Sequence, residues 1–199
     1  MQPEAVSAFV LHARPFKENQ ALLEVLMAGE GRISLITYKG GKKNSAKSAL
    51  LQPFRPIAIQ VKKDSGLRKL LSIEEDKALP LATVSLKGRA LYCGFYLNEI
   101  ICRLCPADAY FPDLYLGYTE ALRQLAWLEP NSLSFEANLQ LILRRFEYRL
   151  LVLLGYGIDF YSDAESGQAI TPEQDYLLLP ESGFVALGSN TTEAKNSLP

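Results

Sequence analysis

The spacing of the apolar residues changes near residue 86, and this change constrains the fold more than any other feature of the chain. Before it, five short runs rich in β-branched and aromatic residues alternate with turns such as Gly29-Glu30-Gly31, where glycine supplies positive φ. Five short strands within about seventy residues predict a small closed barrel over residues 1–80, and an OB-type barrel is the commonest such fold that binds nucleic acid. The expected strands cover residues 6–11 (ending before Arg14-Pro15), 21–26, 32–38, 57–61 and 67–73.

After residue 86 the apolar residues follow a helical period. The pattern predicts three helices that pack antiparallel because their connections are short. Residues 88–104 are apolar nearly all round, which predicts a helix buried at the centre of its domain. Gly155 follows the last helix, where a C′ glycine belongs. The two remaining helices are expected at residues 114–128 and 135–154.

The last forty or so residues show a third pattern. Two short apolar runs, residues 176–179 and 183–187, predict one hairpin. Residues 191–199 are almost entirely polar and are expected to form a disordered tail. The predicted fold class is therefore α+β, with an N-terminal OB-type β-barrel followed by an α-helical domain and a small hairpin in residues 81–190.

Size and composition exclude several classes of protein. The chain has 199 residues, of which 48% are hydrophobic, so it can bury a core. It contains no uncharged apolar run of about 18 residues and no secretory signal, which predicts neither a membrane span nor export. Three cysteines within a short stretch are not a disulfide framework, and we expect a reducing cytoplasm.

Positive charge is concentrated in residues 32–69, here called the basic segment. It carries ten basic residues and one acidic residue, in a chain whose net charge is −1. Such a face attracts polyanions, and single-stranded nucleic acid is the first candidate because cations can follow its backbone while nearby rings stack on its bases. A merely solvated barrel face is the alternative, and charge alone does not separate the two. The candidate nucleic-acid-binding residues are Arg14, Arg32, Tyr38, Lys39, Lys42, Lys43, Lys47, Arg55, Lys62 and Lys63, with Lys42, Lys43 and Lys47 expected on a polar loop.

A second group of arginines lies on the predicted helices. Arg145 and Arg149 are four residues apart and share a helix face, and Arg144 and Arg103 are expected near them. Arginines beside an apolar surface can hold an acidic peptide that ends in a hydrophobic group. The alternative, which periodicity alone favours, is pairing within the helix, with Glu147 placed to bridge Arg144.

No catalytic, cofactor or metal site can be assembled from the sequence. Cys102 and Cys105 have the spacing of metal ligands, but they lie in a predicted buried helix, where cysteine behaves as a small hydrophobe. His12 is the one histidine and has no evident triad partner. We therefore expect a protein that is not an enzyme and holds no metal.

Several strings, taken together in their order, resemble the RecO family of bacterial DNA repair and recombination mediators. The likeness covers about residues 5–190. The strings are Phe9-Val10-Leu11-His12-Ala13-Arg14-Pro15-Phe16 with Glu18, Gly31-Arg32, Lys39-Gly40, Leu51-Gln52-Pro53-Phe54-Arg55-Pro56, Gly94-Phe95-Tyr96-Leu97-Asn98-Glu99, Leu143-Arg144-Arg145-Phe146-Glu147 with Leu150-Leu151, and Leu154-Gly155-Tyr156-Gly157.

The resemblance implies an OB barrel followed by a helical domain, and a role without catalysis in the bacterial cytoplasm, associated with the nucleoid. RecO-like proteins bind single- and double-stranded DNA, anneal complementary strands and work with RecR. Together they help RecA load onto DNA coated by single-stranded-DNA-binding protein, whose acidic C-terminal tail they engage. That tail is the kind of peptide expected at Arg144 and its neighbours. The resemblance therefore favours peptide binding there over ion pairing within the helix.

The chain departs from the family pattern in two places. Many relatives carry two Cys-x-x-Cys pairs after the Leu-Gly-Tyr string, whereas residues 158–163 here contain no cysteine, so no zinc is expected. Relatives also continue for some forty residues past the hairpin, through further helices and a basic Lys-Pro-Leu-Lys-Ser-Arg stretch. A protein-interaction adaptor whose basic barrel docks an acidic partner, without DNA, remains the alternative to DNA binding.

Overall fold

The structure is a computed structural model that describes residues 4–38, 45–62, 67–180 and 182–187. The chain divides into two compact units, Met1–Leu150 and Leu151–Pro199. The barrel and most of the long helices thus belong to one unit.

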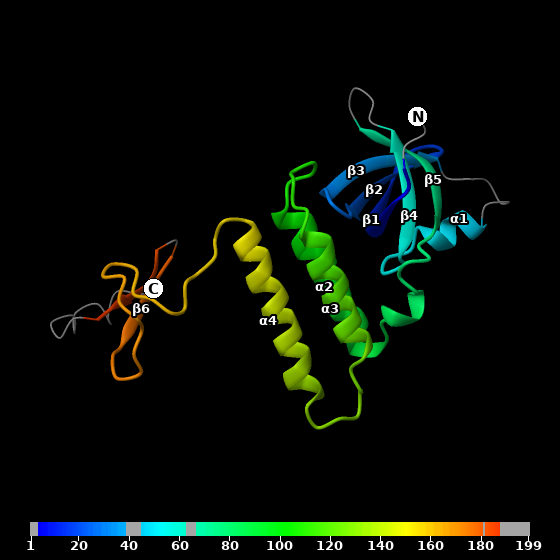
Figure 1. Cartoon of the computed structure of the whole chain (residues 1–199). Coiled ribbons are helices and arrows are strands. Elements are labelled where there is room, and N and C mark those ends of the chain that lie inside the picture. Colours follow the sequence, from blue (N-terminus) through cyan, green and yellow to red (C-terminus); the bar gives the residue numbers. More distant parts are fainter. Residues whose placement is uncertain (1–3, 39–44, 63–66, 181, 188–199) are drawn as a thin grey trace. The chain divides into compact units, whose positions relative to one another are not determined.

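Five strands form a closed barrel in the first unit, with the order β1-β2-β3-β5-β4 (Figure 1). β3 and β5 are parallel, and all other neighbouring pairs are antiparallel. The short helix α1 (Ser45–Leu50), which the sequence pattern did not predict, connects β3 to β4. The predicted OB-type barrel is confirmed. Its strands are β1 (Val6–Lys17), β2 (Gln20–Met27), β3 (Gly31–Tyr38), β4 (Ile57–Lys62) and β5 (Arg68–Glu75).

Alternate residues of each strand fill the barrel. Most residues that point inward are apolar, and their partners on neighbouring strands lie on the same side of the sheet. β1 runs through Pro15 to Lys17 instead of ending before Arg14, because Pro15 pairs with Ala21 while the register shifts around it. The buried core of the barrel consists of Ala8, Val10, Ala21, Leu23, Val25, Met27, Ile33, Leu35, Ile57 and Ile59.

The glycine turn between β2 and β3 has the predicted conformation. Gly29 and Gly31 have φ values of 73° and 119°, which side-chain-bearing residues rarely adopt. Gly31 also lies against the loop that follows α2, where an added Cβ would approach the Ala109 carbonyl oxygen to 3.0 Å. This turn therefore requires glycine for backbone freedom at both positions and for close approach at the second.

Three long helices follow the barrel: α2 (Gly88–Leu104), α3 (Leu114–Ala126) and α4 (Phe135–Leu153), after a short 3₁₀ turn, η1 (Leu81–Thr83). Their bounds agree closely with the sequence expectation. The prediction that α2 is buried all round is wrong, because Tyr92 is 75% exposed and Phe95 is 48% exposed. Only one face of α2 is buried, formed by Ala90, Gly94, Leu97, Asn98 and Ile101.

The outer surface of β1 joins the barrel to the helices. The ring centroid of Phe9 lies 5.6 Å from that of Tyr115 and 5.2 Å from that of Tyr118. Leu11 is the extra residue of a β-bulge, and its carbonyl oxygen accepts a hydrogen bond from Asn98 Nδ2 at 2.9 Å. The Tyr118 hydroxyl donates to Asn98 Oδ1 at 2.5 Å, so the buried amide is satisfied on both sides.

In the second unit, the predicted hairpin is present as β6 (Tyr176–Leu179) and β7 (Gly183–Ala186). The Asp163 carboxylate organises the chain beside it. Its Oδ1 accepts a hydrogen bond from the backbone N–H of Ser166 at 2.6 Å, and its Oδ2 accepts one from the N–H of Ala186 at 2.5 Å. A single side chain thus links the turn that follows it to β7.

Candidate nucleic-acid interface

Strand register brings three cations into one row on the outside of the barrel. Arg14 of β1 pairs with Leu22 of β2, which pairs with Ile36 of β3. Ile36 pairs with Lys69 of β5, and Lys69 pairs with Lys62 of β4. Because neighbours in register share a face, and Leu23 and Leu35 point inward, these five side chains point outward. Arg14, Lys62 and Lys69 are exposed, and we call them the cation row.

The adjacent row carries an aromatic residue and a further cation. Lys17 pairs with Gln20, and Gln20 pairs with Tyr38, at the end of β3. The Tyr38 side chain is 65% exposed. Lys47 of α1 donates from Nζ to the Tyr38 carbonyl oxygen at 3.5 Å, so Lys47 lies on a helix beside the row and not on the loop expected for it.

Sequence reasoning left Lys17 and Lys69 out of the candidate residues. Their charge was visible in the sequence, but the pairing of Lys69 with Ile36 and Lys62, and of Lys17 with Gln20, depends on which strands are neighbours and in what register. Four other candidates, Lys39, Lys42, Lys43 and Lys63, lie outside the described residues.

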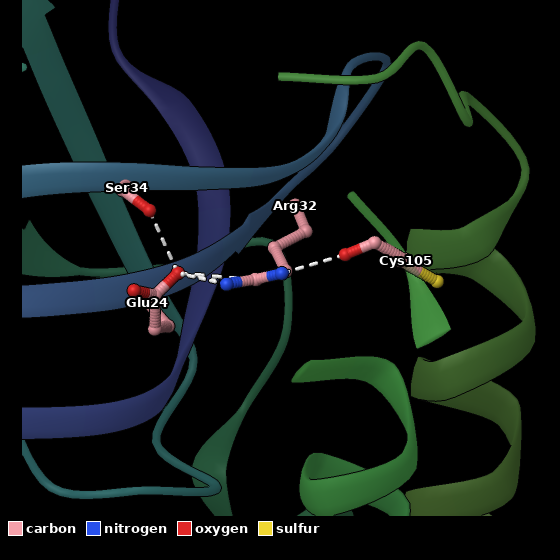
Figure 2. Close-up of polar contacts among 4 residues, drawn as sticks. All are labelled: Glu24, Arg32, Ser34 and Cys105. Atoms are coloured by element: carbon pink, nitrogen blue, oxygen red, sulfur yellow. Dashed lines mark hydrogen bonds and ion pairs between the residues drawn. The ribbon is translucent and has the colours of Figure 1, made fainter. Parts of the chain in front are cut away.

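Arg32 occupies a different environment, shown in Figure 2. Its Nε and Nη2 donate to Glu24 Oε2 at 3.0 and 2.8 Å, and Ser34 Oγ donates to the same oxygen at 2.8 Å. Its Nη1 donates to the Cys105 carbonyl oxygen, just past the end of α2, at 2.6 Å. The side chains of Arg32 and Glu24 are only 16% and 12% exposed. These contacts commit Arg32 to joining the barrel to α2.

Two other arginines of the basic segment are also engaged by protein groups. Arg68 bridges Glu30 and Asp108 at 2.5 and 2.9 Å, which ties the start of β5 to the α2–α3 loop. Arg55 pairs with Glu75 at 3.3 Å. Arg55 precedes β4, whereas Lys62 is the last residue of that strand. The structure therefore does not bring Arg55 together with the cation row.

The predicted peptide site divides into two pairs of arginines. Arg145 and Arg149 of α4 line a pocket of about 100 Å³ against α3. Phe146 and Ile142 supply the apolar wall of the pocket, and Glu120 also lines the pocket. Gly117 on α3 carries no side chain there, which helps to open the space. The remaining lining residues are Ala121 and Gln124.

Arg144 and Arg103 lie outside this lining and have acidic partners on their own helices. Arg144 pairs with Glu147 at 2.5 Å, as the alternative interpretation predicted, and Arg103 pairs with Glu99 at 2.6 Å. Glu147 also accepts a hydrogen bond from the Tyr96 hydroxyl at 2.8 Å, and this bond raises the pKa of Tyr96. The structure therefore brings Arg145 and Arg149 together and leaves Arg144 and Arg103 in local ion pairs.

Burial raises the pKa of each cysteine thiol in the described residues, which disfavours the thiolate. Burial raises the pKa of Cys102, and it raises the pKa of Cys105 to about 11. Thiolates are the metal ligands and nucleophiles, so these side chains are poorly suited to either task. Among the described residues, no three His, Cys, Asp or Glu side chains gather in a way that could hold a metal ion. Within the same residues, no helix is both long and apolar enough to cross a membrane.

Comparison with known proteins gives a consistent result over both halves. Residues 1–75 match the family model described as "Recombination protein O N terminal", and residues 86–196 match "Recombination protein O C terminal". Proteins named DNA repair protein RecO are similar to the chain. The one from Haemophilus influenzae is 36% identical over 94% of this chain and 74% of its own length. Those from Pseudoalteromonas atlantica and Azoarcus sp. are 33% and 34% identical, over 94% and 91% of this chain and 73% and 70% of their own lengths.

Proposed function

The chain belongs to the RecO family, and on that premise we propose that it acts in DNA repair and recombination as a DNA-binding mediator without catalytic activity. The observation that supports DNA binding most directly is the cation row on the OB barrel. Lys62 and Lys69 pair directly on β4 and β5, and Arg14 of β1 lies in the same outward-facing row, separated from Lys69 by β2 and β3. The proposal places the protein with chromosomal DNA in the bacterial cytoplasm.

The proposed mechanism is neutralisation of phosphates. A cation that replaces condensed counterions on DNA gains affinity from their release. A row of cations that contacts two strands at once also lowers the repulsion between them, which favours annealing of complementary strands. Lys17 and Lys47 extend the positive surface toward Tyr38.

The pocket between α3 and α4 supports the second part of the proposal. Arg145 and Arg149 provide donors for carboxylates, and Phe146 and Ile142 provide an apolar wall. We propose that it takes the acidic C-terminal tail of single-stranded-DNA-binding protein. In this account the protein acts with RecR to load RecA onto DNA that this binding protein covers.

Charge reversal tests the DNA-binding proposal. A triple variant, Arg14→Glu, Lys62→Glu and Lys69→Glu, is compared with a matched triple, Lys77→Glu, Lys87→Glu and Arg123→Glu, which makes the same change of charge at exposed positions away from the row. Fluorescence anisotropy with a labelled single strand should show lost binding for the first triple and near-normal binding for the second. Circular dichroism should show that both remain folded.

The same experiment separates DNA binding from the adaptor alternative. Equal losses in the two triples would mean that net charge, and not the cation row, governs binding. If the wild-type protein does not bind DNA at low salt, but forms a stoichiometric complex with an acidic protein, the adaptor alternative is favoured.

A further inference from the structure

Two exposed aromatic residues lie at the end of the barrel that carries the cations. Phe16 of β1 is 42% exposed and Tyr38 of β3 is 65% exposed. We propose that these two rings stack on unpaired bases and set a preference for single-stranded over double-stranded DNA. The inference rests on the proposed DNA binding and adds to it the residues that distinguish the two forms of DNA.

The position of Phe16 follows from an irregularity in β1. Pro15 pairs with Ala21 and Lys17 pairs with Gln20, so Phe16 is an extra residue between two paired ones. Such bulges redirect a side chain from the regular alternation of a strand. Lys17 Nζ lies 5.6 Å from the centroid of the Phe16 ring, so a cation accompanies the ring at the surface.

Tyr38 is placed by the regular part of the sheet. It is two residues beyond Ile36 on the same outward side of β3, and through Gln20 it shares a row with Lys17. Strands are spaced about 4.8 Å apart, so the backbones of Lys17 and Tyr38 are separated by about 10 Å. The two rings therefore stand on strands that flank β2, each with a lysine close by.

Phe54 shows how an aromatic residue of the same segment is used when it serves packing. It is only 6% exposed, and its ring centroid lies 5.0 Å from that of Phe95 on α2. Phe54 and Tyr38 both lie within the basic segment, but only Tyr38 is exposed. Phe16 and Tyr38 are thus exposed beside the cations, whereas Phe54 is buried in packing.

The expected preference follows from what each form of DNA offers. Both forms present phosphates, so the lysines attract both. A duplex keeps the faces of its bases stacked on one another, whereas a single strand can present them to protein rings. Stacking on an aromatic side chain depends weakly on base identity, so the proposed rings select single strands without selecting sequence.

The test uses two oligonucleotides of equal length, one with thymine bases and one with abasic positions that retain every phosphate. Wild-type protein should bind the first more tightly than the second. Phe16→Ala and Tyr38→Ala should each weaken binding to the thymine strand by about 5-fold or more, with little change for the abasic strand or for duplex. Tyr38→Phe should behave as wild type, and Tyr92→Ala, at an exposed ring on α2, is the matched control.

The two proposals fail in different ways. If wild-type protein binds both strands equally, and the alanine variants change nothing, the rings do not read bases even though DNA binding stands. If wild-type protein binds no DNA at low salt, both proposals are overturned. Should Phe16→Ala unfold the barrel, Tyr38→Ala decides alone, because a ring that is 65% exposed contributes little to the core.

Discussion

At the scale of single residues, a cation in the basic segment can serve the fold as well as a ligand. Arg32 and Arg68 join the barrel to the end of α2 and to the loop after it. Arg32 is partly buried, with its guanidinium shared between Glu24 and the Cys105 carbonyl. Charge counted along the sequence cannot reveal this use, since Cys105 and Asp108 are far from their partners in the chain.

Replacing Arg32 by alanine should therefore lower the stability of the protein. The substitution leaves the Glu24 carboxylate, 12% exposed, without its cation, which should reduce the free energy of unfolding by about 2 kcal/mol. Urea unfolding measures the change, and Lys17→Ala, at an exposed position, should alter stability by less than about 0.5 kcal/mol. Normal stability combined with weakened DNA binding would instead indicate that Arg32 contacts DNA.

The turn before β3 allows a comparison of two glycines. Gly31→Ala should destabilise the protein more than Gly29→Ala, because both positions have positive φ but only Gly31 has a backbone oxygen 3.0 Å from an added Cβ. Strain of this kind costs about 1–3 kcal/mol. Thermal unfolding of the two variants measures the difference, and equal losses would show that the α2–α3 loop moves aside.

At the scale of elements, the second unit depends on a carboxylate. Hydrogen bonds from Ser166 lower the pKa of Asp163 from its usual 3.8. The bond from the Ser166 backbone N–H has the largest effect, and the bond from the Ser166 hydroxyl has the next largest. A carboxyl group whose pKa is lower in the folded state stabilises the fold at pH values above its unfolded pKa, and that stabilisation is lost as pH falls through the folded pKa.

Asp163→Asn should therefore weaken the hairpin unit at neutral pH and reduce its loss of order on acidification. Amide hydrogen exchange at Ser166 and Ala186, followed from pH 6 to pH 2, reports both effects. Glu173→Gln, at an exposed position, provides the control and should leave the pH dependence as in the wild type. A variant with an unchanged acid response would show that another group sets it.

The pocket between α3 and α4 gives a prediction at the same scale. Arg145→Ala with Arg149→Ala should abolish binding of an acidic peptide that ends in phenylalanine, because both side chains line the pocket. Arg144→Ala should have little effect, since Arg144 lies outside that lining and pairs with Glu147. Isothermal titration calorimetry with the peptide measures both, and a larger loss for Arg144→Ala would place the site elsewhere.

At the scale of the whole molecule, local patterns predicted the elements, and contacts between elements were harder to predict. The apolar pattern predicted a helix over residues 88–104, and the bounds of α2 agree with that expectation. The exposure of Tyr92 was missed because an apolar pattern does not say which neighbours are present. The cation row was visible only as charge, since register, and not composition, sets Lys69 beside Lys62.

The salt dependence of DNA binding tests the central claim most directly. For a labelled single strand, the logarithm of the binding constant should fall steeply with the logarithm of salt concentration, by about 0.7 for each phosphate neutralised. Replacing Arg14, Lys62 and Lys69 together by alanine should reduce that slope by about 2 while the protein stays folded. An unchanged slope, or no binding at low salt, would contradict the account of the barrel as a DNA-binding surface.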